Sequence, residues 1–189
     1  MGRDARYDKG ILVIDLEATC WEGSKPPAGM GSEIIEIGYA LLSLSTYEIN
    51  QYGGIYVKPV MSTVSDFCFN LTGITQQLLD EYGVSLSSAF GFLVHDLRSR
   101  NLPWASYGFY DKRMIDQVCK KNKWQSPLDN SHINVKALFP LAFNLTKEVG
   151  LDKALSIANL EMIGKHHSGK DDAHNIARLL GIILKKLRN

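Results

Sequence analysis

The stretch GILVIDL, residues 10–16, decides the fold class of this chain. Its nearly continuous apolar character is typical of a strand buried on both faces. The apolar run is interrupted at Asp15 and again at Glu17, directly after Leu16. We therefore expect a strand in the interior of the fold that ends close to two acids.

Further strands and helices are expected on the C-terminal side of this stretch. Residues 33–44 (EIIEIGYALLSL) and 47–58 (YEINQYGGIYVK) are typical of two strands joined by a tight turn, and Pro59 ends the second. Two short strands are predicted at 103–107 and 132–135. Five helices are predicted at 75–82, 87–97, 111–122, 136–147 and 151–160.

The last helix has the clearest pattern. From Asp171 onward, apolar residues recur at three- and four-residue spacing and form an amphipathic stripe. The loop-like stretch 21–31 is too short to separate two folded units. Strands come first and helices mixed with strands follow, which predicts a single α/β domain over residues 1–189.

Composition and charge exclude several classes of protein. The 189 residues fit one domain with a sizeable core, and 45% hydrophobic with 22% charged residues argue against disordered and fibrous chains. No apolar run reaches the length of a membrane span, and the polar N-terminus does not resemble a signal peptide. The net charge of +1 is low for a tight nonspecific nucleic-acid binder. It suits an enzyme that releases its substrate, or a protein that meets no nucleic acid.

The cysteines indicate the compartment. There are three, an odd number without close pairing in the sequence. Such usage favours a reduced, intracellular environment, and we expect a cytoplasmic protein.

Asp15 and Glu17 are the first candidate functional residues. Side chains alternate along a strand, so both project from the same face, roughly 6–7 Å apart. Two such carboxylates repel each other and raise their pKa values unless a cation lies between them. The alternative is that the strand ends at Leu16 and both acids are solvated.

Asp172 and His167 form a second candidate group near the start of the last helix. Asp172 lies one turn before Ile176 and therefore faces the apolar stripe, which stabilisation of the helix dipole does not require. The dipole alone accounts for Asp171. His167 precedes Asp172 by five residues in a glycine-containing segment. It is either a solvated loop residue or a proton acceptor beside an inward acid.

Asp111 completes the set of acids. It follows the predicted strand 103–107 and a turn, and its alternative role is the N-cap of the next helix. Hard oxygen ligands of this kind favour Mg²⁺ or Mn²⁺ over zinc, and no Cys/His cluster has zinc spacing. Two such ions about 3.5–4 Å apart serve phosphodiester hydrolysis. We therefore expect a site for Mg²⁺, for which Mn²⁺ substitutes.

At this point the sequence resembles the DEDDh 3′→5′ exonucleases of the RNase H-like fold. Those enzymes carry D-x-E on the first strand, an Asp in the middle, and a His with four residues before the final Asp. The matching positions here are Asp15, Glu17, Asp111, His167 and Asp172.

Further segments are similar to the histone-mRNA 3′ exonuclease group, which includes the enhanced-RNAi exonucleases and bacterial KapD-type relatives. These segments are IDLEATC (14–20), EIIEI (33–37), SDFC (65–68), LTGIT (71–75) and SGKDDAHNIA (168–177). The similarity runs from about Ile11 to Leu184.

The resemblance implies a mixed sheet of about five strands flanked by helices, and it implies roles for single residues. Two Mg²⁺ ions would be held by Asp15, Glu17, Asp111 and Asp172. His167 would deprotonate the attacking water, while Glu17 would also contact the terminal nucleotide together with Ala18 and Thr19. Tyr110 would stack on the terminal base, and its alternative role is a core aromatic beneath the site. His166, with a different spacing from Asp172, is expected to matter little.

The resemblance also implies the reaction: release of 5′-nucleoside monophosphates from a single-stranded 3′ end, with RNA as the expected substrate. A DNA exonuclease of proofreading or repair type uses the same residues and remains the alternative. An inactive nucleic-acid-binding module is a second alternative, although unpaired like charges would destabilise it. Some members of the group carry an N-terminal nucleic-acid-binding module, for which 189 residues leave no room.

Overall fold

The computed structural model describes residues 10–188; residues 1–9 and 189 of the expected domain lie outside it. The described residues form a five-stranded sheet in the order β3-β2-β1-β4-β5. Its strands are β1 (Gly10–Ala18), β2 (Ile34–Ser43), β3 (Ile49–Tyr56), β4 (Trp104–Ser106) and β5 (His132–Asn134). The sheet is mixed, because β1 pairs antiparallel with β2 and parallel with β4. The apolar stretch of residues 10–16 therefore lies at the centre of the sheet, and it is almost wholly buried, as predicted.

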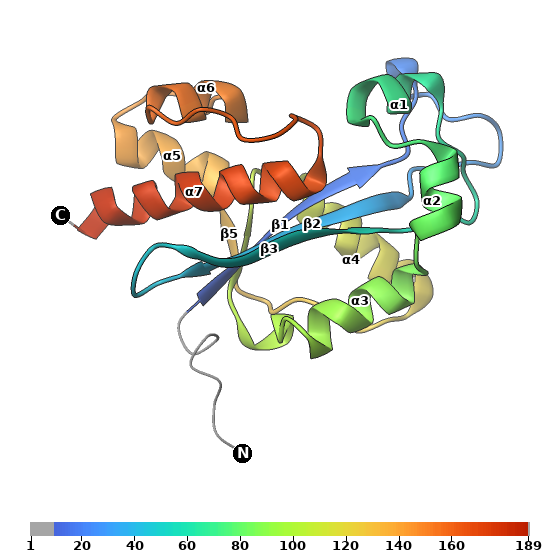
Figure 1. Cartoon of the computed structure of the whole chain (residues 1–189), viewed down its shortest axis with the longest axis horizontal. Coiled ribbons are helices and arrows are strands. Elements are labelled where there is room, and N and C mark those ends of the chain that lie inside the picture. Colours follow the sequence, from blue (N-terminus) through green and yellow to red (C-terminus); the bar gives the residue numbers. More distant parts are fainter. Residues whose placement is uncertain (1–9, 189) are drawn as a thin grey trace.

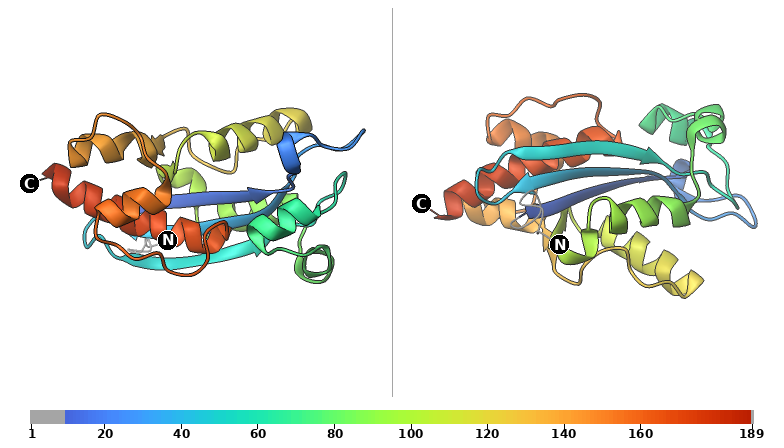
Figure 2. Two further views of the ribbon diagram at one scale, coloured as in Figure 1. Left: turned by 90° about the horizontal axis from the view of Figure 1, so that it is seen from above. Right: turned by 60° about the horizontal axis from the view of Figure 1, so that its bottom comes forward.

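Helices cover both faces of the sheet (Figure 1 and Figure 2). One face carries α5 (Val135–Phe143), α6 (Leu151–Ile157) and α7 (Gly169–Arg188), and the other carries α3 (Leu86–His95) and α4 (Tyr110–Asn122). Two short helices, α1 (Asp66–Thr72) and α2 (Gln76–Tyr82), lie beyond the ends of β1 and β2. The two faces have separate apolar cores.

The alternation of β1 determines where its acids point. Leu12, Ile14 and Leu16 pack in the core under α3 and α4, whereas Ile11 and Val13 pack in the core under α7. Asp15 and Glu17 project to the same face as Ile11 and Val13, because side chains alternate along a strand. Both acids therefore face the side of the sheet that carries α7.

The structure differs from the sequence-based predictions at two elements. β1 continues to Ala18, so Asp15 and Glu17 lie within it, and the alternative of a strand that ends before solvated acids is wrong. Helix α1 was not predicted from the residue pattern. Its start is set by Ser65, whose hydroxyl accepts a hydrogen bond from the Cys68 N–H.

The N-terminus of α7 rests directly on β2. A Cβ atom at Gly38 would lie 1.8 Å from the carbonyl oxygen of Gly169, so glycine is required for this close approach. The contact fixes the first turn of α7, and with it Asp172, against the sheet. Within residues 10–188, no helix has both the length and the apolar character needed to cross a membrane.

Candidate active site

The site forms where β4 stops and β1 continues. The ladder with β4 involves Leu12 and Val13 of β1, which leaves the rest of that edge open to the N-terminus of α4. Asp111 fills the gap: its Oδ1 accepts a hydrogen bond of 2.9 Å from the Leu16 N–H. The alternative role of Asp111 as an N-cap is wrong, because the N-cap of α4 is Phe109 and Asp111 lies in the first turn. The carboxylate instead bridges helix and strand.

Asp172 reaches the same place from the opposite side. It lies in the first turn of α7 and is 3% exposed, so it faces inward as expected. Its carboxylate accepts hydrogen bonds from the His167 N–H at 2.8 Å and from His166 Nδ1 at 3.0 Å. Carboxylate oxygens of Asp15, Glu17 and Asp172 lie within 4.8 Å of one another. Three elements distant in sequence thus bring four acids together.

The acids are short of compensating positive charge. Burial, reinforced by the nearby Asp172 and Glu36 carboxylates, raises the pKa of Glu17 from 4.5 to about 8. Burial also raises the pKa of Asp111 to about 6, and burial with the Asp111 charge holds the pKa of Asp15 well above its usual range. A cation between these groups would relieve the repulsion. Clustered carboxylate oxygens are the ligands that Mg²⁺ and Mn²⁺ prefer, so the donor set fits such ions.

A cavity of about 340 Å³ opens over the acids. Among the residues that line it are Asp15, Glu17, Ala18, Tyr110, Asp111, His166, His167 and Asp172. Tyr110 is 48% exposed, so the alternative of a core aromatic is wrong. Its phenol stays protonated, because burial of the hydroxyl and the nearby Asp111 raise its pKa to about 12.

Thr19 is the predicted site residue that the structure does not bring to this cavity. Its side chain is fully buried. The hydroxyl lies 2.9 Å from that of Ser62 and accepts a hydrogen bond from the Glu33 N–H. Thr19 therefore links the end of β1 to the segments that carry Glu33 and Ser62.

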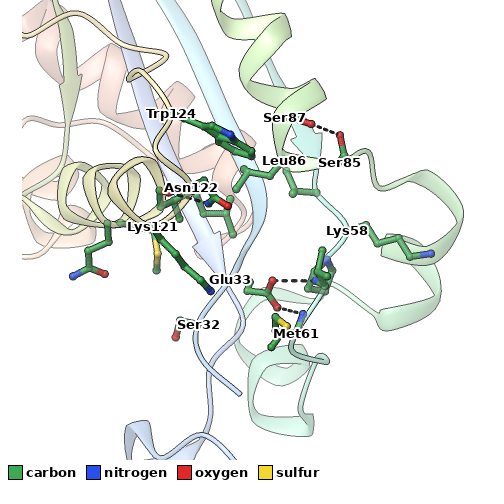
Figure 3. Close-up of a pocket in the computed structure, with 17 residues that line it drawn as sticks. Ser32, Glu33, Lys58, Met61, Ser85, Leu86, Ser87, Lys121, Asn122 and Trp124 are labelled. Carbon is green, nitrogen blue, oxygen red and sulfur yellow. Dashed lines mark hydrogen bonds between the residues drawn. The ribbon is translucent and has the colours of Figure 1, made fainter. Parts of the chain in front are cut away.

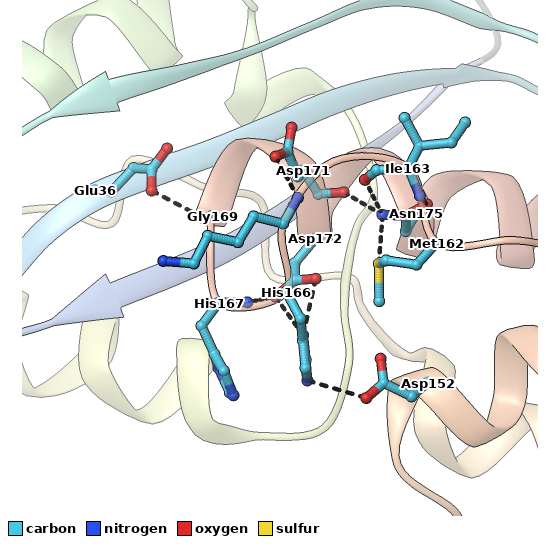
Figure 4. Close-up of polar contacts among 11 residues, drawn as sticks. Glu36, Asp152, Met162, Ile163, His166, His167, Gly169, Asp171, Asp172 and Asn175 are labelled. Atoms are coloured by element: carbon cyan, nitrogen blue, oxygen red, sulfur yellow. Dashed lines mark hydrogen bonds and ion pairs between the residues drawn. The ribbon is translucent and has the colours of Figure 1, made fainter. Parts of the chain in front are cut away.

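Both histidines lie at the cavity, including His166, for which no role was expected. Their rings are stacked with centroids 4.0 Å apart, and His167 has a left-handed backbone with φ of 63°. Figure 4 shows the His166 ring between the carboxylates of Asp172 and Asp152. Burial and the neighbouring His166 lower the pKa of His167. Its imidazole is therefore neutral near pH 7 and able to accept a proton.

Two supporting residues were missed by the sequence analysis. Glu36 of β2 accepts hydrogen bonds from the N–H groups of Gly169 at 2.8 Å and Lys170 at 3.1 Å, which fixes the start of α7. Asn175 of α7 bonds both backbone groups of Ile163 and so holds the segment before the histidines. Glu36 carries the same signal as Asp15, an acid inside an apolar strand. No comparable signal marks Asn175.

A larger hollow lies elsewhere and lacks this chemistry. It has a volume of about 480 Å³ between the start of α3, the C-terminal half of α4 and residues 57–61 (Figure 3). Glu33 is the only acid among the described residues that line it. Burial would raise its pKa, but hydrogen bonds from the Ser62 hydroxyl and the Val60 and Met61 N–H groups lower it overall. The Glu33 carboxylate is therefore already engaged in hydrogen bonds with its own neighbours.

Comparison with known proteins identifies the family. The family model described as exonuclease (RNase_T) matches residues 12–180. This chain belongs to the exonuclease family. The match begins in β1, two residues after its start, and ends inside α7, so it includes all four acids and both histidines.

Individual relatives of this chain agree with the family assignment. Human ERI1 exoribonuclease 2 is 33% identical over 89% of this chain and 27% of its own length. The 3′-5′ exonuclease Snipper of Drosophila melanogaster is 30% identical over 90% of this chain and 67% of its own length. The chain thus spans about a quarter to two thirds of these relatives.

A solved structure confirms the expected RNase H-like nuclease fold. It is the nuclease domain of 3′hExo, a DEDDh family member, bound to rAMP. The two chains superpose with a TM-score of 0.83 and 28% sequence identity, over 97% of this chain and 94% of that one.

Proposed function

We propose that this exonuclease hydrolyses single-stranded RNA from its 3′ end and releases 5′-nucleoside monophosphates. The observation that carries the proposal is the convergence of four under-compensated acids and a neutral histidine on one cavity. Relatives named as exoribonucleases and a structural neighbour bound to rAMP support RNA over DNA.

The acids would hold two divalent ions, Mg²⁺ in the cell, with Mn²⁺ able to replace it. Asp15 and Glu17 of β1, Asp111 of α4 and Asp172 of α7 would supply the oxygens. When bound, such ions activate water and neutralise the charge that develops on the phosphate.

The remaining residues bind the strand and move the proton. His167 would accept the proton of the attacking water, for which its lowered pKa is suited. Glu17 and Ala18 would contact the terminal nucleotide from the end of β1. Tyr110 would stack on its base through the exposed ring, a contact that tolerates any sequence. We leave Thr19 a supporting role, because its hydroxyl is engaged in the interior.

The nucleic acid is the proposed partner, and the proposed location is the cytoplasm. Cys20, Cys68 and Cys119 all carry free thiols, which supports a reducing compartment.

The test compares 5′-labelled single-stranded RNA, single-stranded DNA and RNA duplexes of equal length with Mg²⁺. We expect a ladder that shortens from the 3′ end, 5′-monophosphate products, and faster cleavage of RNA than of DNA. The 2′-hydroxyl is the group that separates the two substrates. Equal or faster cleavage of DNA would favour the repair-type alternative, and binding without hydrolysis would favour the inactive module.

A further inference from the structure

His166 occupies a position that neither the acid set nor the general base accounts for. Its Nδ1 lies 3.0 Å from Oδ2 and 3.2 Å from Oδ1 of Asp172. A carboxylate that binds a cation is ionised and has no proton to donate, so Nδ1 would carry the hydrogen when an ion is bound. The contact therefore sets the tautomer of His166 as well as the orientation of Asp172.

The other edge of the same ring faces a second carboxylate. Nε2 of His166 lies 3.8 Å from Oδ2 of Asp152, which projects from the first turn of α6. The ring is thus oriented from both sides, as Figure 4 shows. Asp152 is largely exposed, with 68% of its side chain accessible, so it adds less to this arrangement than the buried Asp172.

The His166 ring also packs against the ring of its neighbour. The rings of His166 and His167 stack with an interplanar angle of 19°. The left-handed backbone of His167 places its N–H on the same Asp172 oxygen that His166 contacts. Asp172 is therefore held by two adjacent residues, with a carboxylate oxygen within 4.8 Å of one from Asp15 and one from Glu17.

We propose that His166 is a positioning residue that orients the Asp172 carboxylate for divalent-ion binding and, through the ring stack, restrains His167. The inference rests on the proposed function, in which Asp172 is an ion ligand. Partners that hydrogen-bond to metal ligands typically change metal affinity or activity by about 10–100-fold when they are removed. In this protein the side chain of His166 forms such a hydrogen bond with Asp172.

The experiment measures Mn²⁺ affinity by calorimetry on the full chain without RNA, for the wild type and three variants. In His166→Asn the side-chain amide places an N–H donor at the position of Nδ1. In His166→Gln the amide N–H lies one bond further from the backbone, at the position of Nε2. His166→Ala has no side-chain donor. We expect Mn²⁺ affinity to fall about 10–100-fold in the Ala and Gln variants and to be largely retained in the Asn variant. Thermal unfolding of each variant checks that it is folded.

A matched control is His174→Asn. His174 belongs to α7 as well, but its ring stacks on Tyr52 at 4.3 Å, and it does not line the cavity. We expect its Mn²⁺ affinity to equal that of the wild type.

The outcomes separate this inference from the proposed function. Unchanged affinity in His166→Ala, or equal losses in all three His166 variants, would overturn the positioning role while the wild type still binds Mn²⁺ and cleaves RNA. A fall in kcat with unchanged Mn²⁺ affinity and a flattened pH profile would make His166 the base, which also overturns it. A wild type that binds no Mn²⁺ would refute the proposed function itself.

Discussion

The contact between α7 and β2 gives a quantitative prediction for Gly38. In Gly38→Ala the new methyl group would lie 1.8 Å from the Gly169 carbonyl oxygen, whereas ordinary contact begins at 3.4 Å. The start of α7 must therefore retreat by the difference between these distances, about 1.6 Å. Asp172 lies three residues further along the same helix and would move with it.

This displacement is large on the scale that catalysis tolerates. A misplacement of about 1 Å can lower a rate about 10²-fold, so we expect kcat to fall at least about 100-fold. The hydrogen bonds from Gly169 and Lys170 to Glu36 would stretch as well. Hydrogen bonds to charged groups contribute roughly 1.5–3 kcal/mol each, and the free energy of unfolding should fall by about that amount for each bond lost.

The assay is single-turnover RNA cleavage at saturating Mg²⁺, combined with urea unfolding followed by circular dichroism. Gly91→Ala is the control, because Gly91 lies within α3 and its added Cβ would meet no atom within 4 Å. That variant should keep its activity and gain about 0.4–1 kcal/mol of stability. If Gly38→Ala retained both wild-type kcat and wild-type stability, the argument that α7 needs this close approach would be wrong.

Three further predictions concern the cavity. His167→Ala should lower kcat by roughly 10²–10⁴ with little change in KM, measured by steady-state kinetics; a raised KM at constant kcat would assign His167 to binding alone. Tyr110→Ala should raise KM by about 5–150-fold, because stacking contributes about 1–3 kcal/mol per base, and an unchanged KM for RNA would exclude the stack. The pKa of Glu17 is raised from 4.5 to about 8 in the folded protein. Between these two pH values the native state therefore binds more protons than the unfolded state. The stability of the metal-free protein should fall as pH rises from 4.5 to about 8. Divalent ions should therefore raise Tm more at pH 8 than at pH 5.5, and an equal rise at both values would contradict the pKa shift.

Much of the fold could be predicted because its signals are local. The apolar stretch of residues 10–16 could be recognised as the central strand, and the stripe after Asp171 as an amphipathic helix, since burial requires these patterns. Helix α1 was missed because seven residues with two buried side chains, Cys68 and Thr72, show no usable period.

The site was predictable where acids interrupt apolar patterns, and less so where contacts are long-range. Asp15, Glu17 and Asp172 stand out in sequence. The hydrogen bond from Leu16 to Asp111 spans 95 residues and that from Gly169 to Glu36 spans 133, and no spacing rule predicts either. The hydrogen bond between His166 and Asp172 could not be predicted from their spacing, because a residue with a left-handed backbone, His167, lies between them.

The central claim is that the four acids act through divalent ions, and Asp15→Asn tests it most directly. Removing one of several crowded carboxylates relieves repulsion, so the metal-free variant should be folded with a Tm equal to or above that of the wild type.

The measurement is the rate of 3′-end RNA cleavage as Mg²⁺ is titrated back after chelation, for the wild type and Asp15→Asn side by side. We predict that chelation abolishes wild-type cleavage, that Mg²⁺ restores it, and that folded Asp15→Asn stays inactive at every Mg²⁺ concentration. Substantial cleavage by the wild type in excess chelator, or by Asp15→Asn with Mg²⁺, would contradict the account.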